Sequence, residues 1–178
     1  PLECFLDKKN SHISLGVKTN PDDRYNLYDY SYTSSNSEFS RNYWTSYYKD
    51  IVALELINFN SKILEIGSND GYLLSIFRDS GFRNVEGIDS SKKMVEVAEK
   101  NKIKTRHELF NFKNAKQINK KYDLIIANNV FNHSNDPDDF LKGVINSLSD
   151  NGTFVFEVPY WLDTIKDFRF DQIYHEHV

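Results

Sequence analysis

The most constraining feature of the chain is the stretch 62–79, where a short apolar strand, a glycine turn and a helix follow one another directly. Residues 62–71 read Lys-Ile-Leu-Glu-Ile-Gly-Ser-Asn-Asp-Gly, and the helical run Tyr-Leu-Leu-Ser-Ile-Phe-Arg-Asp follows. Such a turn presents backbone N–H groups and a helix N-terminus to a bound small molecule. Asn69 stands where G-x-G-x-x-G needs a glycine, and the Gly-Lys-Ser/Thr of a P-loop is missing. The spacing therefore excludes the usual dinucleotide site and the P-loop.

Strand and helix signals alternate regularly after residue 60. The expected strands are 63–66, 85–88, 103–107, 122–127 and 153–158, and the expected helices are 72–79, 91–100, 112–118 and 137–148. Ser90 is the expected N-cap of the second helix, and Asp136-Pro137 is a strong start for the last one. Repeated βα units of this kind predict a doubly wound, mostly parallel sheet.

The segment before this alternation is rich in aromatic residues. Phe39, Tyr43, Tyr47, Ile51 and Leu54 recur at helical spacing, which predicts the core face of a helix packed on the sheet. The polar-aromatic stretch 30–35, Tyr-Ser-Tyr-Thr-Ser-Ser, has no such period. A loop of this composition can close over a pocket.

Composition excludes several classes of protein. The 178 residues are 39% hydrophobic and 27% charged, which suits one ordinary globular domain. The formal net charge is −4 without a basic block, so sequence-independent nucleic-acid binding has little electrostatic support. A single cysteine excludes a disulfide framework and an all-cysteine metal site. Because no apolar run approaches about 18 residues and no signal-peptide pattern opens the chain, we expect a cytoplasmic protein without a membrane segment.

Two groups of residues carry candidate acid–base chemistry. Residues 170–177 contain two histidines, two acids and a tyrosine, but His-Glu-His lacks the spacing that places two metal ligands on one helical face. His133 follows the fourth expected strand, whose carboxyl end should border the ligand crevice. Histidine has a near-neutral pKa, so this position is suited to proton abstraction.

The spacing Glu-x-Gly-x-x-x-Gly resembles motif I of the class I S-adenosylmethionine (SAM) methyltransferases. Glu65 and Asp70 can meet the cationic amino-acid end of SAM, and the glycines let the backbone approach the ligand. Five ordered motifs together resemble the SAM-dependent C-methyltransferases of nucleotide-linked 4-keto-deoxysugars: Tyr-x-Tyr-x-Ser-Ser, Leu-Glu-Ile-Gly-Ser-Asn-Asp-Gly, Ala-Asn-Asn-Val-Phe-x-His, Phe-Glu-Val-Pro-Tyr and Phe-Asp-x-Ile-Tyr-His-Glu-His. This resemblance extends over nearly the whole chain.

The resemblance implies an enzyme with SAM as cofactor, S-adenosylhomocysteine (SAH) as product and a nucleotide-linked sugar as partner. An acid about 20 residues beyond the glycine turn commonly accepts the ribose hydroxyls, and Asp89 holds that position. Residues 110–112 are expected near the adenine. The full set of expected cofactor contacts is Glu65, Gly67, Ser68, Asn69, Gly71, Asp89, Phe110, Asn111, Phe112, Asn128 and Asn129.

The resemblance also implies how the methyl acceptor is activated. In that family a histidine of the Tyr-x-Glu-His segment removes the proton next to the sugar ketone, and the resulting enolate attacks the methyl group. Carried over, the base is His177, with Glu176 and Tyr174 orienting it or stabilising the enolate. His133 is the competing base. The expected substrate contacts are Tyr30, Tyr32 and Tyr160.

The chain departs from the family at both ends. Where the family's N-terminal zinc module has its second Cys-x-x-Cys pair, residues 7–10 read Asp-Lys-Lys-Asn, so we expect no metal site. Residues 1–36 are expected to form a degenerate module and the aromatic loop, and residues 37–178 the SAM-binding Rossmann-like domain. The family sheet has seven strands, but residues 159–178 contain no convincing strand pair. We therefore expect a sheet without its last two strands in a piece of a longer protein, with a compact five-strand variant as the alternative.

Two other functions are compatible with the same SAM cleft. An O- or N-methyltransferase would use His133 or His177 to deprotonate a hydroxyl or an amine. A non-catalytic SAM-binding subunit would keep the cofactor residues alone. The family's C-terminal domain, which helps to hold the nucleotide, is also missing here, and the acceptor is therefore the least constrained part of the hypothesis.

Overall fold

A parallel sheet of five strands forms the centre of the protein in the computed structural model, which describes residues 3–21, 23–27 and 32–169. The strands are β3 (Lys62–Ile66), β4 (Asn84–Asp89), β5 (Thr105–His107), β6 (Tyr122–Asn128) and β7 (Leu148–Glu157). Their order is β5-β4-β3-β6-β7, and every neighbouring pair is parallel. Strand order therefore reverses between β3 and β6, where doubly wound sheets bind their ligands. The predicted fold class is confirmed.

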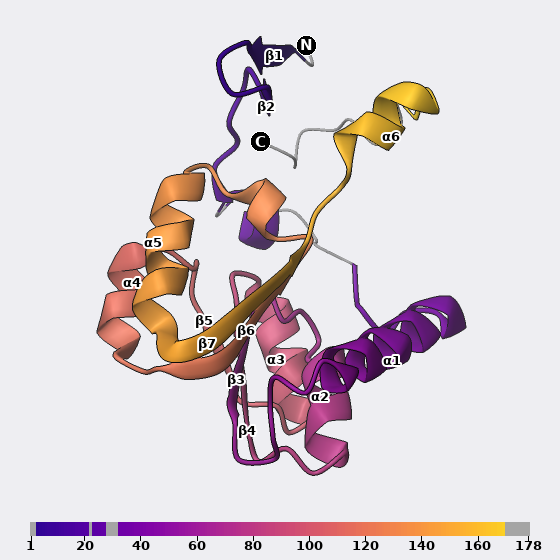
Figure 1. Cartoon of the computed structure of the whole chain (residues 1–178), viewed down its shortest axis with the longest axis vertical. Helices are drawn as coiled ribbons and strands as arrows, with labels where there is room; N and C mark the ends of the chain where they lie inside the picture. Colours follow the sequence, from indigo (N-terminus) through magenta and orange to yellow (C-terminus); the bar gives the residue numbers. More distant parts are fainter. Residues whose placement is uncertain (1–2, 22, 28–31, 170–178) are drawn as a thin grey trace.

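Helices cover both faces of the sheet (Figure 1). The helices of one face are α1 (Glu38–Ala53), α2 (Tyr72–Asp79) and α3 (Lys92–Lys100), and those of the other face are α4 (Phe112–Ile118) and α5 (Pro137–Ser147). Side chains alternate along β3, so that Ile63 packs in the core under α1–α3 and Leu64 in the core under α4 and α5. Because both faces are buried, the central strands are almost continuously apolar, as parallel strands usually are.

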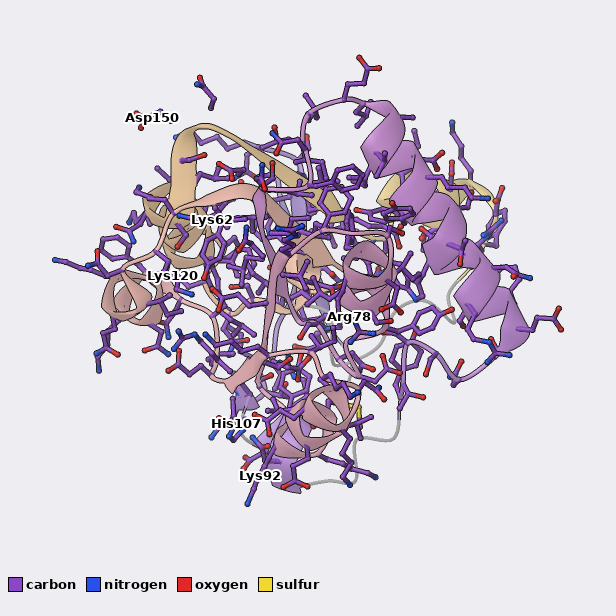
Figure 2. The ribbon with its side chains drawn as sticks, turned by 90° about the horizontal axis from the view of Figure 1, so that it is seen from below. Lys62, Arg78, Lys92, His107, Lys120 and Asp150 are labelled. Carbon is purple, nitrogen blue, oxygen red and sulfur yellow. The ribbon has the colours of Figure 1, made fainter. Side chains whose placement is uncertain are left out.

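Only part of the face that the spacing of α1 predicted is buried, because Ile51 lies in the core and Tyr47 packs against it, whereas the other predicted residues are exposed. Phe39 and Leu54 were expected in the core, but they are 81% and 59% exposed, and Tyr43 is also classed as exposed. The buried residues of the helix are Trp44 and Ile51. The reason is that α1 lies along the outer flank of the molecule (Figure 2), beside α2. Helix α1 therefore has more apolar side chains than its neighbours can bury.

Two boundaries also differ from expectation. The N-cap of α3 is Ser91 and not Ser90, because the Ser91 hydroxyl accepts a hydrogen bond from the Met94 N–H at 3.4 Å. The last strand was expected to begin after the Asn-Gly pair at 151–152, but β7 begins at Leu148. A register shift against β6 accommodates the extra residues.

Shorter elements lie toward the carboxyl ends of the strands. They are the antiparallel hairpin of β1 (Cys4–Asp7) and β2 (His12–Leu15), the π-helical turn η1 (Asp23–Leu27), the 3-10 turn η2 (Phe131–His133) and helix α6 (Trp161–Lys166). The hairpin was not predicted, and it stands apart from the sheet in Figure 1. Among the helices of the described residues, none is both long and apolar enough to cross a bilayer.

Candidate active site

A cavity of about 330 Å³ lies at the carboxyl ends of β3 and β4, beside the switch point of the sheet. Residues following β5 and β6 and the start of α5 complete its walls. The sequence-predicted residues that line it are Gly67, Asp89, Phe110, Asn111 and His133. The structure thus brings together side chains from four separate βα units at the position expected for a ligand.

The glycine turn keeps one wall of this cavity open. Gly67 has a φ of +68°, and a Cβ atom added there would lie 2.2 Å from Cγ2 of Val130. Gly71 has a φ of +75° and is the N-cap of α2, but its added Cβ would meet Ile103 at 3.0 Å. Gly67 therefore shapes the cavity, whereas Gly71 allows the turn to pack on the protein interior.

Asp89 is fixed by the backbone at the edge of the cavity. Its Oδ2 accepts a hydrogen bond from the Asn69 N–H and its Oδ1 one from the Ser91 N–H, both at 2.8 Å. Burial raises the pKa of Asp89, and the two backbone hydrogen bonds oppose that effect. Each carboxylate oxygen keeps a second lone pair, so Asp89 can still accept hydrogen bonds from a ribose diol.

Glu65 does not line the cavity, but in the described part of the chain it is a buried acid with an unpaired oxygen, one residue before Ile66, which does line the cavity. Glu65 lies in β3 opposite Gly87 of β4, and its buried Oε2 has no hydrogen-bond partner among the described residues. Burial, with Asp70 and Asp89 nearby, raises the pKa of Glu65 well above its usual range. Ser68 Oγ is likewise buried, and no described residue hydrogen-bonds to it. Unpaired acceptors of this kind are costly, and they fit the ammonium group of SAM.

Asp70 was expected to share this role with Glu65, and its carboxylate accepts three hydrogen bonds from the chain. Oδ2 accepts hydrogen bonds from the Ser35 N–H at 3.1 Å and from the Ser35 hydroxyl at 2.6 Å. Oδ1 accepts one from the Tyr72 N–H at 3.2 Å, at the start of α2. Oδ2 is therefore saturated, whereas Oδ1 keeps one lone pair.

Asn69 is also used by the aromatic loop. Its Oδ1 accepts from the Ser34 N–H at 2.9 Å, and its Nδ2 donates to the Tyr32 carbonyl at 3.1 Å. Asn69 itself has a φ of +51°, a conformation that asparagine tolerates better than most residues. Residues 32–35 are thus tied directly to the glycine turn, which places the predicted pocket-closing loop beside the cofactor residues.

A second polar group lies where β6 and β7 end. The Tyr47 hydroxyl donates to Asn128 Oδ1 at 2.9 Å, while Asn128 Nδ2 is buried without a partner among the described residues. Asn129 Nδ2 donates to Glu157 Oε1 at 2.7 Å, and the Tyr43 hydroxyl donates to Glu157 Oε2. Sequence reasoning missed Tyr43, Tyr47 and Glu157. The available signal was that a half-buried helix face carries tyrosine and not phenylalanine. A buried tyrosine hydroxyl needs a hydrogen-bond partner.

The N-terminal segment contributes an unexpected wall. Pro21 and Tyr25 line the cavity opposite the glycine turn. Arg24 fixes this segment, because its guanidinium donates to the Thr19 hydroxyl and, at 3.1 Å, to the carbonyl of His133. One buried arginine thus links the segment that precedes the aromatic loop to the turn that carries the candidate base.

The remaining predicted residues lie farther from the cavity or were not placed. Phe112 begins α4, is 38% exposed and does not line the cavity. Tyr160 precedes α6 and is exposed. The Tyr32 side chain is half exposed, and burial followed by the charges of Asp70 and Glu157 raises its pKa. Four predicted residues lie outside the described part of the chain: Tyr30, Tyr174, Glu176 and His177.

The charge of the cavity restricts its ligand. Its described lining includes the acids Asp89, Glu108, Asp136 and Asp139 and neither lysine nor arginine. An anionic phosphate would be repelled there, whereas hydroxyl and amino groups can donate to the carboxylates. The lining therefore suits a neutral or cationic nucleoside derivative.

Comparisons with known proteins agree with this chemistry. Residues 39–178 match a family model described as a methyltransferase domain. C-methyltransferase NovU of Streptomyces niveus is 33% identical over 118 residues, which is 65% of this chain and 28% of that protein. Ubiquinone biosynthesis O-methyltransferase of Pelagibacter ubique (strain HTCC1062) is 37% identical over 97 residues, 52% of this chain and 40% of that protein. The chain therefore spans less than half the length of these two curated relatives.

Solved structures share the fold. A SAM-dependent methyltransferase from Archaeoglobus fulgidus superposes with a TM-score of 0.63 at 18% identity, covering 77% of this chain and 61% of that one. The plantazolicin methyltransferase BpumL, crystallised with SAH, superposes with a TM-score of 0.52 at 21% identity, covering 74% of this chain and 57% of that one.

Proposed function

Because the chain belongs to the methyltransferase-domain family, we propose that it transfers a methyl group from SAM to a carbon atom of a nucleotide-linked keto-sugar. SAM is the cofactor of this domain, and it supplies an electrophilic methyl group when bound. Glu65 and Ser68 offer unpaired acceptors for its amino-acid end, and Asp89 offers a carboxylate for its ribose. The acid-lined cavity excludes phosphate and accepts the adenosine.

The observation that carries the proposal is that a histidine, His133, lines the same cavity as Gly67 and Asp89. Methylation at carbon requires a base close to the cofactor, because the acceptor carbon must first lose a proton. The similarity to C-methyltransferase NovU supports carbon as the acceptor atom.

The chemistry then requires a general base and a group that stabilises the enolate. A base takes the proton from the carbon next to the ketone, and the C–H electron pair forms an enolate whose carbon accepts the methyl group. The family resemblance favours His177 as the base, with Glu176 and Tyr174 orienting it or donating to the enolate oxygen, whereas His133 is the histidine that lines the described cavity. General-base assistance is typically worth about 10²–10⁴-fold in rate. His133 is the competing base, and it then accepts the proton in place of His177.

Solvent-deuterium exchange separates the two assignments. With a nucleoside-diphosphate 4-keto-6-deoxyhexose and SAH, the wild-type protein should exchange the proton next to the ketone. His177→Ala should abolish exchange and leave SAH affinity unchanged. Exchange that persists in His177→Ala but disappears in His133→Ala would transfer the role to His133. Absence of exchange in the wild-type protein would contradict enolate chemistry as a whole.

O-methylation is the second candidate, and the ubiquinone biosynthesis relative favours it. In that reaction the same base would deprotonate a hydroxyl group, and no carbon-bound proton would exchange. The exchange experiment therefore distinguishes the two candidate functions as well as the two bases.

A further inference from the structure

The polar group at the ends of β6 and β7 includes Asn128 and Asn129, which the sequence predicts as cofactor contacts, but neither residue lines the described cavity. We call it the tyrosine–glutamate cluster, and its members are Tyr43, Tyr47, Asn128, Asn129 and Glu157. Asn128 and Glu157 face each other in the register of the two strands, so the cluster lies at the carboxyl edge of the sheet. Both tyrosines reach it from α1.

The cluster lies between the cofactor acid and the outer sheet edge. Burial, together with the charges of Glu157 and Glu65, raises the pKa of Tyr47 to about 12, although its hydrogen bond to Asn128 acts in the opposite direction. Tyr47 therefore remains a neutral donor and lies close enough to both acids to experience their charge. Tyr32 of the aromatic loop experiences Glu157 in the same way. Glu65 pairs with Ile126 of β6, and Asn128 lies two residues farther along that strand on the same face, so the cluster borders the proposed amino-acid end of the cofactor site.

The hydrogen bonds within the tyrosine–glutamate cluster leave a donor and several acceptor lone pairs that a ligand can use. Asn128 Nδ2 is buried without a partner among the described residues, which is costly unless an acceptor arrives. Glu157 uses one lone pair on each oxygen, for Tyr43 and for Asn129, and keeps the others. If the cluster only held α1 against β7, the hydrogen bond from Tyr43 to Glu157 would be enough. A buried donor beside a carboxylate instead matches the adjacent hydroxyl and carbonyl groups of a sugar ring.

We infer that the tyrosine–glutamate cluster binds the oxygen-rich ring of the methyl acceptor, with Glu157 accepting from a hydroxyl group and Asn128 Nδ2 donating to a neighbouring oxygen. Tyr43 and Asn129 hold the Glu157 carboxylate in place. This inference rests on the proposed function, since it names the groups that would recognise the sugar. It assigns the acceptor to the β6–β7 side and the adenosine to the β3–β4 side of the same sheet edge.

Titration calorimetry on the SAH complex tests this inference with a nucleoside-diphosphate 4-keto-6-deoxyhexose as probe. Glu157→Gln should bind the sugar nucleotide about tenfold to a hundredfold more weakly, the loss typical of a hydrogen bond to a charged group. Tyr43→Phe should show a smaller loss. SAH affinity should stay within about twofold of wild type in both. Tyr48→Phe is the matched control, because Tyr48 lies on the same helix but packs edge-to-face on Phe77 at 4.9 Å.

The possible results distinguish a failure of this inference from a failure of the proposed function. Equal sugar-nucleotide affinity in wild type and Glu157→Gln would overturn the inference and leave the proposed function intact. A parallel loss of SAH affinity would also overturn it, because the cluster would then support the cofactor site or the fold. If the wild-type protein binds no sugar nucleotide at all, the proposed function fails, and the inference fails with it.

Discussion

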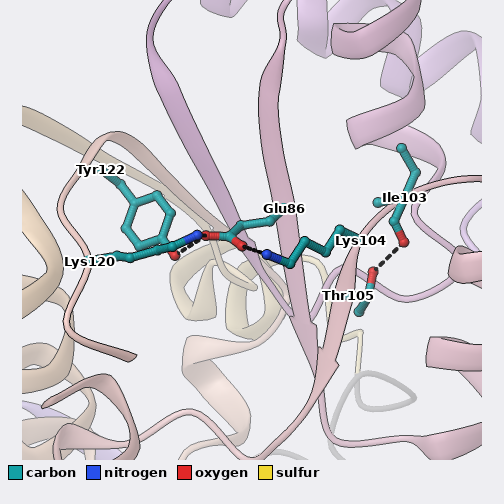
Figure 3. A network of polar contacts seen from close by, with 6 residues as sticks. All are labelled: Glu86, Ile103, Lys104, Thr105, Lys120 and Tyr122. Atoms are coloured by element: carbon teal, nitrogen blue, oxygen red, sulfur yellow. Dashed lines mark hydrogen bonds and ion pairs between the residues drawn. The ribbon is translucent and has the colours of Figure 1, made fainter. Parts of the chain in front are cut away.

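Two buried glutamates on neighbouring strands differ in charge because their neighbours differ. Burial acts to raise the pKa of Glu86, but hydrogen bonds from Lys120 and Tyr122 and the charge of Lys104 outweigh it, and the pKa is lowered (Figure 3). In the part of the chain that the structure describes, no lysine or tyrosine pairs with Glu65, and burial together with the charges of Asp70 and Asp89 raises its pKa. Glu86 is therefore a structural anion, whereas Glu65 is prepared for a cation from outside the protein.

We expect SAM to bind more weakly as the pH falls through the raised pKa of Glu65. Below that pKa the free protein holds a proton on Glu65, and the ammonium group must displace it, at about tenfold in affinity per pH unit. Asp70, Asp89 and Tyr47 are the other charged or titratable groups that act on this site. Calorimetry in two buffers of different protonation enthalpy should show proton release on binding.

Matched glutamine variants test the assignment. Glu65→Gln should remove the pH slope and weaken SAM binding by about 1–3 kcal/mol, while Glu86→Gln should keep the slope. A raised folded-state pKa also means that the free protein loses stability as the pH rises from the ordinary value of 4.5 toward the raised one. Glu65→Gln should therefore be more stable than wild type at neutral pH. A slope that survives in Glu65→Gln would exclude Glu65 as the titrating group.

At the scale of elements, Gly67 is the glycine of the β3–α2 turn that lines the cavity. Gly67→Ala places a Cβ against Val130 and forces a left-handed φ on alanine, which alone costs about 1–2 kcal/mol. We expect it to reduce both SAM affinity and stability in thermal unfolding and calorimetry. Gly81→Ala is the control, because Gly81 also has a positive φ of +104° but its nearest neighbour, Phe59, lies at 3.5 Å.

The control should lose stability and keep SAM affinity, because Gly81 lies outside the cavity lining. Adding Val130→Ala to Gly67→Ala should recover part of the affinity, since it removes the clash and leaves only the strained φ. Wild-type affinity in Gly67→Ala alone would show that this turn does not contact the ligand.

The aromatic loop is tied to the glycine turn by a side chain that can be removed. Ser35→Ala deletes the 2.6 Å hydrogen bond to Asp70, and hydrogen exchange of residues 32–37 should become faster, with a stability loss of about 0.5–1.5 kcal/mol. Ser34→Ala should change neither, because the Ser34 hydrogen bond to Asn69 comes from its backbone N–H. Unchanged exchange in Ser35→Ala would mean that the loop is held by other contacts.

Elements with a strong local pattern were predictable, and those set by tertiary contacts were not. The bounds of α2 and α4 agree with the sequence because glycine and asparagine signals flank them. The β1–β2 hairpin has a fully exposed first strand, so no hydrophobic alternation marked it. The choice of Ser91 as N-cap depends on Asp89, whose carboxylate accepts the Ser91 N–H.

At the scale of the whole molecule, the site also contains residues that local sequence patterns predict and residues that only tertiary contacts bring in. Gly67, Asp89 and His133 were predictable because each follows a strand, and the carboxyl ends of parallel strands meet at one edge. Arg24, Tyr43 and Glu157 reach the site from segments about 110 residues apart in sequence, as in the Arg24 to His133 and Tyr43 to Glu157 contacts. No local pattern encodes such pairs, so only the folded chain reveals them.

The central claim is that the protein builds a carbon–carbon bond with the methyl group of SAM. The most direct measurement is carbon NMR of the product after incubation with SAM labelled with ¹³C in its methyl group and a nucleoside-diphosphate 4-keto-6-deoxyhexose. The account predicts a labelled methyl that couples to a ring carbon. A labelled methoxy signal, bound through oxygen and without that coupling, would contradict it.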